Sequence, residues 1–204
     1  MILLINSQFS ILNSQFSTFD KNITLYINGC HSPFFDNFFY IYTQTWTWIP
    51  AILLLLVWMW RKWGVRSLYV VAGIALCILL ADQISSSLLK SLVARLRPTH
   101  NPEIADLIHT VNGYRGGRYG FVSSHAANAA TFVTFTALVF RNRLYTILLS
   151  LWAFFTAYSR VYLGVHYVGD VLCGALIGVL VGMGVYFVLK PLLSKGLNGS
   201  RSRE

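Results

Sequence analysis

Long apolar blocks separated by short polar turns make up most of this 204-residue chain. Five of the blocks approach the roughly 20 residues that a helix needs to cross a bilayer, if the shorter ones borrow turns from their flanking loops. They lie at about Trp46–Trp63, Ser67–Lys90, His125–Phe140, Leu144–Ser159 and Tyr167–Leu189. The pattern predicts an all-α polytopic membrane bundle of about five spanning helices.

The N-terminal residues 1–45 have a different pattern. Residues 1–17 contain a short repeat, and we expect a poorly ordered or interfacial lead-in there. Thr18–Ile27 is amphipathic and is followed by Asn28-Gly29, a typical helix stop, while Phe34–Tyr42 is rich in aromatic residues. Both segments are too short to span, so we expect amphipathic interfacial helices. The predicted organisation is therefore lead-in and interfacial helices over 1–45, a membrane bundle over 46–190, and a basic cytoplasmic tail over 191–204.

Composition supports the membrane assignment. The chain is 55% hydrophobic and only 11% charged, whereas soluble domains carry about 25% charged residues. The net charge of +9 does not indicate nucleic acid, because the basic residues form no stripe interleaved with aromatic ones. They sit at the ends of the apolar blocks, as membrane topology requires. The expected partners are the bilayer and a membrane lipid.

The basic residues in the short loops predict the orientation. Three clusters should face the cytoplasm: Arg61, Lys62 and Arg66; Arg141 and Arg143; and Lys190, Lys195, Arg201 and Arg203. By parity, the long loop Ser91–Ser124 and the turn Ser159–His166 then lie together on the non-cytoplasmic face. Basic residues persist on that face against the usual bias, namely Lys90, Arg95, Arg97, Arg115, Arg118 and Arg160. We therefore expect an anionic group to hold them.

The candidate catalytic and phosphate-binding residues form separate groups along the sequence, and all of these groups are expected at this outer face. If the second span continues as a helix, Lys90 and Arg97 are two turns apart on one face until Pro98 ends it. Two cations at the mouth of a bundle form a phosphate clamp; for Lys90 alone, the alternative is a lysine at the end of a span that extends its ammonium to the interface. Ser123 and Ser124 then begin a helix whose free N–H groups face outwards, with Ser123 as the cap. His125 follows in the first turn and could protonate a leaving oxygen.

The turn after the fourth span carries the third set. If Asp170 lies in the first turns of the next helix, it shares a face with His166 and can accept a proton from one imidazole nitrogen. The other nitrogen is then free to attack, and Arg160 offers a planar fork of donors for an oxyanion. A bland polar turn is the alternative. Two histidines with separate roles suggest double displacement on phosphorus through a phosphohistidine. Three nearby cations would repel a divalent ion, so we expect no metal and no cofactor.

Two further features stand outside these sets. Asp82 is an intramembrane carboxylate, which is costly in lipid; we expect it to anchor the site helices by hydrogen bonding. The glycine-rich segment Tyr114–Gly120 carries Arg115 and Arg118. These arginines could read a second anionic group on the substrate, or could belong to a flexible loop that contacts lipid headgroups.

The three motifs, Lys90-x6-Arg97-Pro98, Ser123-Ser124-His125 and Ser159-Arg160-x5-His166-x3-Asp170, resemble the signature of the type-2 phosphatidic acid phosphatase superfamily, which includes bacterial lipid phosphatases and vanadium haloperoxidases. The resemblance implies a helical bundle and metal-independent phosphoester or diphosphate hydrolysis. It assigns phosphate binding to Lys90, Arg97, Ser123, Ser124 and Arg160, with His125 as acid and base, His166 as nucleophile and Asp170 as its orienter. The second motif usually reads Pro-Ser-Gly-His, so Ser124 either crowds the phosphate or adds a hydroxyl to it.

The sequence thus predicts an integral membrane lipid phosphatase, in a bacterial inner membrane, whose site faces the periplasm or exterior. Undecaprenyl diphosphate, phosphatidylglycerol phosphate, phosphatidic acid and the phosphates of lipid A all fit this chemistry. Two alternatives remain open: a phosphotransferase that passes the phosphoryl group to another lipid, and a non-catalytic transporter of anionic lipid. A transporter would be expected to show inverted repeats, which this sequence does not display.

Overall fold

A computed structural model describes residues 2–198, and side chains between residues 15 and 194. The described part of the chain is built from helices and turns, with one isolated bridge between Leu96 and Tyr119. The α-helices are α1 (Ile2–Gly29), α2 (Pro33–Tyr42), α3 (Ile49–Trp63), α4 (Ser67–Asp82), α5 (Lys90–Val93), α6 (Ser124–Phe140), α7 (Arg143–Tyr162) and α8 (Val168–Asn198). A π-helix, η3 (Gln83–Leu89), joins α4 to α5, and 3-10 turns lie at Thr45–Trp48, Gly64–Arg66, Pro98–His100, Ala105–Leu107 and Val111–Gly113.

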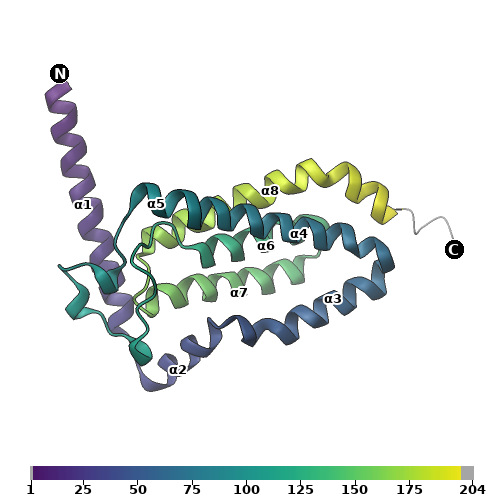
Figure 1. Ribbon diagram of the computed structural model, residues 1–204, viewed down its shortest axis with the longest axis horizontal. Coiled ribbons are helices and arrows are strands. Elements are labelled where there is room, and N and C mark those ends of the chain that lie inside the picture. Colours follow the sequence, from purple (N-terminus) through teal and green to yellow (C-terminus); the bar gives the residue numbers. More distant parts are fainter. Residues whose placement is uncertain (1, 199–204) are drawn as a thin grey trace.

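Five helices run side by side and form an elongated bundle: α3, α4, α6, α7 and α8 (Figure 1). The all-α membrane bundle expected from the sequence is therefore confirmed. Within the described residues, three stretches are long and apolar enough to cross a membrane: Thr45–Val93, Arg143–Tyr162 and Val168–Ser194. The first of them folds back on itself as the α3/α4 hairpin, so it supplies two of the five helices (Figure 1).

Helix α6 lies against three others, α4, α7 and α8. Glycines on α8 allow the closest of these contacts. A Cβ at Gly174 would lie 2.5 Å from the carbonyl oxygen of Ser123, and one at Gly178 would lie 2.3 Å from that of Ala127. Small residues let helix backbones approach in this way within membranes, and here they bring the beginning of α6 close to the beginning of α8.

The N-terminal part is one long helix, not a lead-in followed by a short one. Helix α1 runs from Ile2 to Gly29 and ends where the Asn28-Gly29 stop predicts. The sequence has neither proline nor glycine before Gly29, so nothing interrupts the helix. In Figure 1, α1 lies across one end of the bundle, beside α2 and the α5–α6 loop. Its interfacial position in a membrane stays a prediction.

Candidate active site

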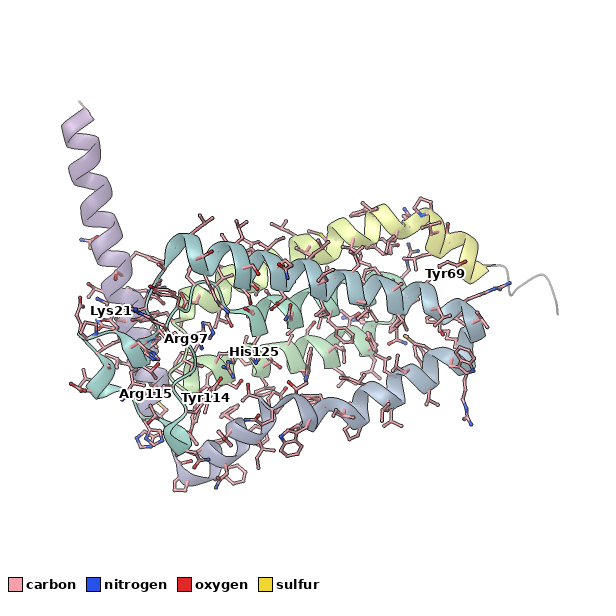
Figure 2. All side chains as sticks on the ribbon, in the orientation of Figure 1. Lys21, Tyr69, Arg97, Tyr114, Arg115 and His125 are labelled. Atoms are coloured by element: carbon pink, nitrogen blue, oxygen red, sulfur yellow. The ribbon has the colours of Figure 1, made fainter. Side chains whose placement is uncertain are left out.

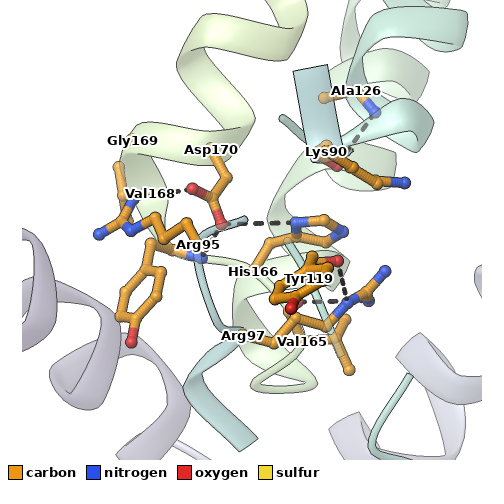
Figure 3. A network of polar contacts seen from close by, with 12 residues as sticks. Lys90, Arg95, Arg97, Tyr119, Ala126, Val165, His166, Val168, Gly169 and Asp170 are labelled. Carbon is orange, nitrogen blue, oxygen red and sulfur yellow. Dashed lines mark hydrogen bonds and ion pairs between the residues drawn. The ribbon is translucent and has the colours of Figure 1, made fainter. Parts of the chain in front are cut away.

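His166 lies in the turn between α7 and α8 and is 1% exposed. Its Nδ1 is 3.5 Å from Oδ2 of Asp170, which stands in the first turn of α8 as predicted (Figure 3). That separation is too long for a good hydrogen bond, and the backbone of Gly120 also lies against the ring. Oδ2 also accepts the N–H of Tyr167 at 3.1 Å. Catalytic contacts are often loose in the absence of substrate.

The surroundings keep His166 uncharged. Burial, and then the positive charges of Arg97, Arg160 and Lys90, hold the pKa of this imidazole well below its usual 6.5. At neutral pH the ring therefore has a free lone pair, which is what a nucleophile requires.

Two buried arginines flank this histidine. Arg97 donates from Nε to the carbonyl oxygen of Tyr119 at 3.1 Å and from Nη1 to that of Val165 at 3.3 Å. Arg160, 1% exposed, donates to the hydroxyls of Thr43 at 2.6 Å and Tyr114 at 2.9 Å. All four acceptors are uncharged oxygens, so both guanidinium charges stay available to a bound anion.

The route by which Arg97 reaches the site differs from the sequence prediction. Helix α5 ends at Val93, Ala94 takes a left-handed conformation with φ of 48°, and Arg97 is extended. Lys90 and Arg97 therefore do not share a helix face, and that expectation was wrong. A residue before proline disfavours the α conformation, which explains why the helix ends before Arg97. The two charges still act on each other electrostatically.

A chain of hydroxyls joins Lys90 to the buried part of the bundle. The ammonium group of Lys90 donates to Oγ of Ser124 at 2.8 Å. Oγ of Ser124 is 2.8 Å from Oγ of Ser86, which donates to Oδ1 of Asp82 at 3.0 Å. Asp82 and Ser86 belong to the same continuous stretch, α4 and η3, so the contact between helices is the one from Ser86 to Ser124. That Asp82 anchors the site helices stays a prediction.

The beginning of α6 brings in the second motif. Ser123 is the N-cap, as predicted, and its hydroxyl accepts the N–H of Ala126 at 3.4 Å. Its own N–H donates to the carbonyl oxygen of Asp170 at 3.0 Å, which ties α6 to α8. His125 follows in the first turn with an exposed side chain. The ionisable groups that act on it electrostatically are Arg160, His166, Lys90 and Arg97, so all three motifs converge here.

The remaining sequence candidates lie further out. Figure 2 places Arg97 and Arg115 at the α1 end of the bundle, with Tyr69 at the opposite end. Arg115 and Arg118 have exposed side chains, and Arg118 lies over the ring of Tyr119, 5.5 Å from its centroid. Their backbones fasten the loop, because their carbonyl oxygens accept from Thr99 and Arg97. A headgroup contact by their side chains stays a prediction.

Sequence reasoning missed the function of Arg95 and missed Asp20 altogether. Arg95 donates to Oδ1 of Asp170 at 2.7 Å (Figure 3). It also donates to Oδ2 of Asp20 at 2.8 Å. The anionic group expected beside the basic residues of this face is, for Arg95, a pair of the protein's own carboxylates. The available signal was the four-residue spacing of Asp20, Thr24 and Asn28 along the amphipathic segment, which puts three polar side chains on one helix face.

One group of side chains has the spacing of metal ligands, and it lies outside the motifs. His31, Asp36 and His109 offer ligand atoms within 4.8 Å of one another. The two imidazole rings are stacked with centroids 3.8 Å apart, so their in-plane lone pairs run nearly parallel. An ion would need one ring to turn. In the structure, Asp36 instead pairs with Nε2 of His109 at 2.9 Å.

Comparison with known proteins decides the family. The PAP2 superfamily model matches residues 68–192, which is more than half of the chain. The chain belongs to the PAP2 superfamily. It is 45% identical over 183 residues to a lipid A 4′-phosphatase of Bacteroides thetaiotaomicron, covering 88% of this chain and 80% of the relative. It is 39% identical over 184 residues to a lipid A 4′-phosphatase of Porphyromonas gingivalis, covering 89% and 77%.

Solved PAP2 structures have the same fold. The crystal structure of Aquifex aeolicus LpxE is 27% identical, with a TM-score of 0.63 over 80% of this chain and 92% of the other. A transmembrane PAP2-type phosphatidylglycerolphosphate phosphatase from Bacillus subtilis has a TM-score of 0.67 at 22% identity, covering 87% of each chain. This PAP2 protein is therefore an integral membrane lipid phosphatase.

Proposed function

We propose that this PAP2 phosphatase removes the 4′-phosphate from lipid A at the non-cytoplasmic face of the membrane. Of the four substrate classes that fit the sequence, lipid A is favoured by the two relatives, each of which spans nearly nine-tenths of this chain. The observation that carries the chemistry is the buried, neutral His166 between two buried arginines that bond only uncharged oxygens.

The proposed reaction consists of two displacements at phosphorus. In the first, Nε2 of His166 bonds to phosphorus while the bond from phosphorus to the sugar oxygen breaks, and His125 gives its proton to that oxygen. The bound phosphate dianion favours the protonated form of His125 that this step requires. In the second, water attacks the phosphohistidine, His125 takes the proton from that water, the N–P bond breaks and phosphate leaves. Lys90, Arg97 and Arg160 balance the charge on the equatorial oxygens.

Substitution of either histidine tests the mechanism. In detergent with excess chelator, wild-type protein should release phosphate from lipid A. The rate of release by His166→Ala should be at least ~10³-fold lower, because no other side chain can form the covalent intermediate. His100→Ala is the matched control, since His100 lies in the outer loop and its ring contacts Thr99; it should stay within about twofold. Release that requires added metal, or that survives loss of His166, would contradict the mechanism.

An aryl phosphate separates the two roles of His125, because its leaving group needs no proton. With this substrate, His125→Ala should still form the phosphoenzyme but should discharge it roughly 10²–10⁴-fold more slowly. An alkali-stable, acid-labile phosphoenzyme caught by rapid quench is the expected readout. Discharge at the wild-type rate would show that His125 is not the base for water, and an equal slowing of both steps would contradict the proposed division of its roles.

A lipid panel tests the substrate and the remaining alternative. Lipid A should be cleaved at least ~10-fold faster, by kcat/KM, than phosphatidic acid, phosphatidylglycerol phosphate or undecaprenyl diphosphate, and a preference for one of these lipids would overturn the assignment. Transfer of the phosphoryl group to an added lipid alcohol, in place of free phosphate, would identify a phosphotransferase.

A further inference from the structure

We infer that Asp20 of α1 and Arg95 of the outer loop are positioning residues for the nucleophile, acting on His166 through Asp170. This inference rests on the proposed phosphohistidine mechanism. It assigns a catalytic purpose to the docking of the N-terminal helix, which lies outside residues 68–192 that match the family model.

The first step concerns the two oxygens of Asp170. Arg95 binds Oδ1 at 2.7 Å, which leaves Oδ2 to face His166 and the N–H of Tyr167. A carboxylate held through one oxygen cannot rotate to offer the other. Arg95 therefore decides which oxygen of Asp170 meets the imidazole and at what angle (Figure 3).

The second step is that Arg95 itself needs an anchor, because it belongs to an irregular segment after α5. Asp20 supplies the anchor, with Oδ2 at 2.8 Å from Nη2 of Arg95. Oδ1 of Asp20 accepts the N–H of Gly169 at 2.9 Å, at the beginning of α8, where a helix favours negative charge. One carboxylate thus fixes both the arginine and the helix that carries Asp170. A Cβ at Gly169 would lie 2.9 Å from Oδ2 of Asp20, so glycine is what permits this approach.

The third step is charge. Asp20 and Asp170 are 3% and 0% exposed at their side chains, and Arg95 is the cation that both of them contact. Two carboxylates and one guanidinium carry a net charge of −1. His166 gains positive charge when Nε2 bonds to phosphorus, and the triad presents its net negative charge to Nδ1 of that ring. Asp20 therefore acts over three contacts, through Arg95 and Asp170, on the imidazole that changes charge in the reaction.

The same face of α1 provides matched controls. Thr24, one turn after Asp20, accepts the N–H of Val168 at 3.3 Å, and Asn28 contacts the backbone of Tyr162 and His109. These contacts dock α1 but touch no member of the charged triad. A variant at Thr24 weakens the docking without altering the charge beside Asp170.

The experiment compares Asp20→Asn, Arg95→Lys and Thr24→Val with wild type on lipid A in detergent. Asp20→Asn and Arg95→Lys should lower kcat by 10–100-fold with KM within about twofold, because the phosphate-binding cations are untouched and a lysine cannot span two carboxylates. Thr24→Val should lose about as much thermal stability as Asp20→Asn, but its kcat should stay within about threefold of the wild-type value.

Inhibition by two anions gives a second readout. Orthovanadate accepts a bond from the nucleophile and mimics the five-coordinate transition state, whereas inorganic phosphate needs only the cations. In Asp20→Asn the inhibition constant for vanadate should rise at least ~10-fold, and that for phosphate should stay within about twofold. A merely structural effect would move both constants together.

Equal kcat in Asp20→Asn and Thr24→Val, or a loss in Asp20→Asn that appears in KM and in phosphate inhibition, would overturn the inference. Different results would contradict the proposed function itself: wild type would release no phosphate from lipid A, or His166→Ala would remain active. If His166→Ala is inactive and Asp20→Asn equals wild type, the inference alone is wrong.

Discussion

At the scale of single residues, Ser124 is the informative departure from the family motif. The hydroxyl stands between the ammonium of Lys90 and Oγ of Ser86, at 2.8 Å from each. It therefore fixes the position of Lys90, and Lys90 is one of the cations proposed to bind phosphate. A glycine, which is usual at this position, would leave that ammonium with the 3.5 Å contact to Ser86.

Substitution of Ser124 tests this interpretation. Ser124→Ala and Ser124→Gly both remove the hydroxyl, and a hydrogen bond to a charged group contributes about 1.5–3 kcal/mol. We expect KM for lipid A to rise roughly 10-fold in both variants, with kcat within about threefold, as measured by steady-state phosphate release. If the side chain crowds the phosphate, Ser124→Gly should instead bind substrate more tightly than wild type.

At the scale of elements, α2 shows how a short helix outside the bundle is fastened to the site. Ser32 caps it, Pro33 begins it and Asp36 lies in its first turn. Oδ1 of Asp36 accepts the hydroxyl of Tyr162 at 2.7 Å, and Oδ2 pairs with His109. Asp36 therefore links α2 to the end of α7 and to the outer loop.

The pKa of Asp36 makes this link dependent on pH. Burial raises the pKa of this carboxyl, but hydrogen bonds from Tyr162 and His109 outweigh the burial and hold it below 3.8. A folded-state pKa that is lowered contributes stability above pH 3.8, and this contribution disappears as the pH falls through the folded value. Asp36→Asn should lower Tm by roughly 2–6 °C at pH 6, from a loss of about 1–2 kcal/mol.

Thermal unfolding in detergent across pH 3 to 6 measures the effect. The difference in Tm between wild type and Asp36→Asn should be constant above about pH 5 and should shrink as the pH falls below 3.8. A difference that grows on acidification would show that the charged carboxylate does not stabilise the folded state.

At the scale of the whole molecule, opposite ends of the bundle have different chemistry. Figure 1 places the α3–α4 turn and the C-terminal part of α8 at one end, and α1, α2 and the α5–α6 loop at the other. Arg61 and Lys62 lie in the last turn of α3, whereas the catalytic candidates lie at the α1 end. The positive-inside bias then predicts that the site faces away from the cytoplasm.

The native cysteines allow a direct test of this orientation. Cys30, between α1 and α2, is exposed, while Cys77 is buried and Cys173 is half-buried. A membrane-impermeant maleimide should label Cys30 in intact spheroplasts, and Cys30→Ser should abolish the signal. Arg61→Cys in the Cys30→Ser background should react only after permeabilisation. The reverse pattern would place the site in the cytoplasm.

Much of the fold could be read from the chain, because lipid leaves few choices to an apolar block. Each block must satisfy its backbone hydrogen bonds internally and so becomes a helix. The spacing of His166 and Asp170, and the capping by Ser123, depend only on neighbours within a few residues. These local features were predicted correctly. The prediction of a continuous helix from Lys90 to Arg97 was wrong. The end of that helix depends on backbone conformations around Ala94 and Pro98, which hydrophobic periodicity does not indicate.

The sequence by itself therefore determined the helical bundle, the three motifs and the family resemblance, since these follow from local pattern and hydropathy. Only the tertiary structure decided what holds Arg95. Its partners Asp20 and Asp170 are 75 residues away in each direction, and nothing local in the chain pairs them. Contacts between distant charges depend on how helices dock, and docking is settled by packing across the whole molecule.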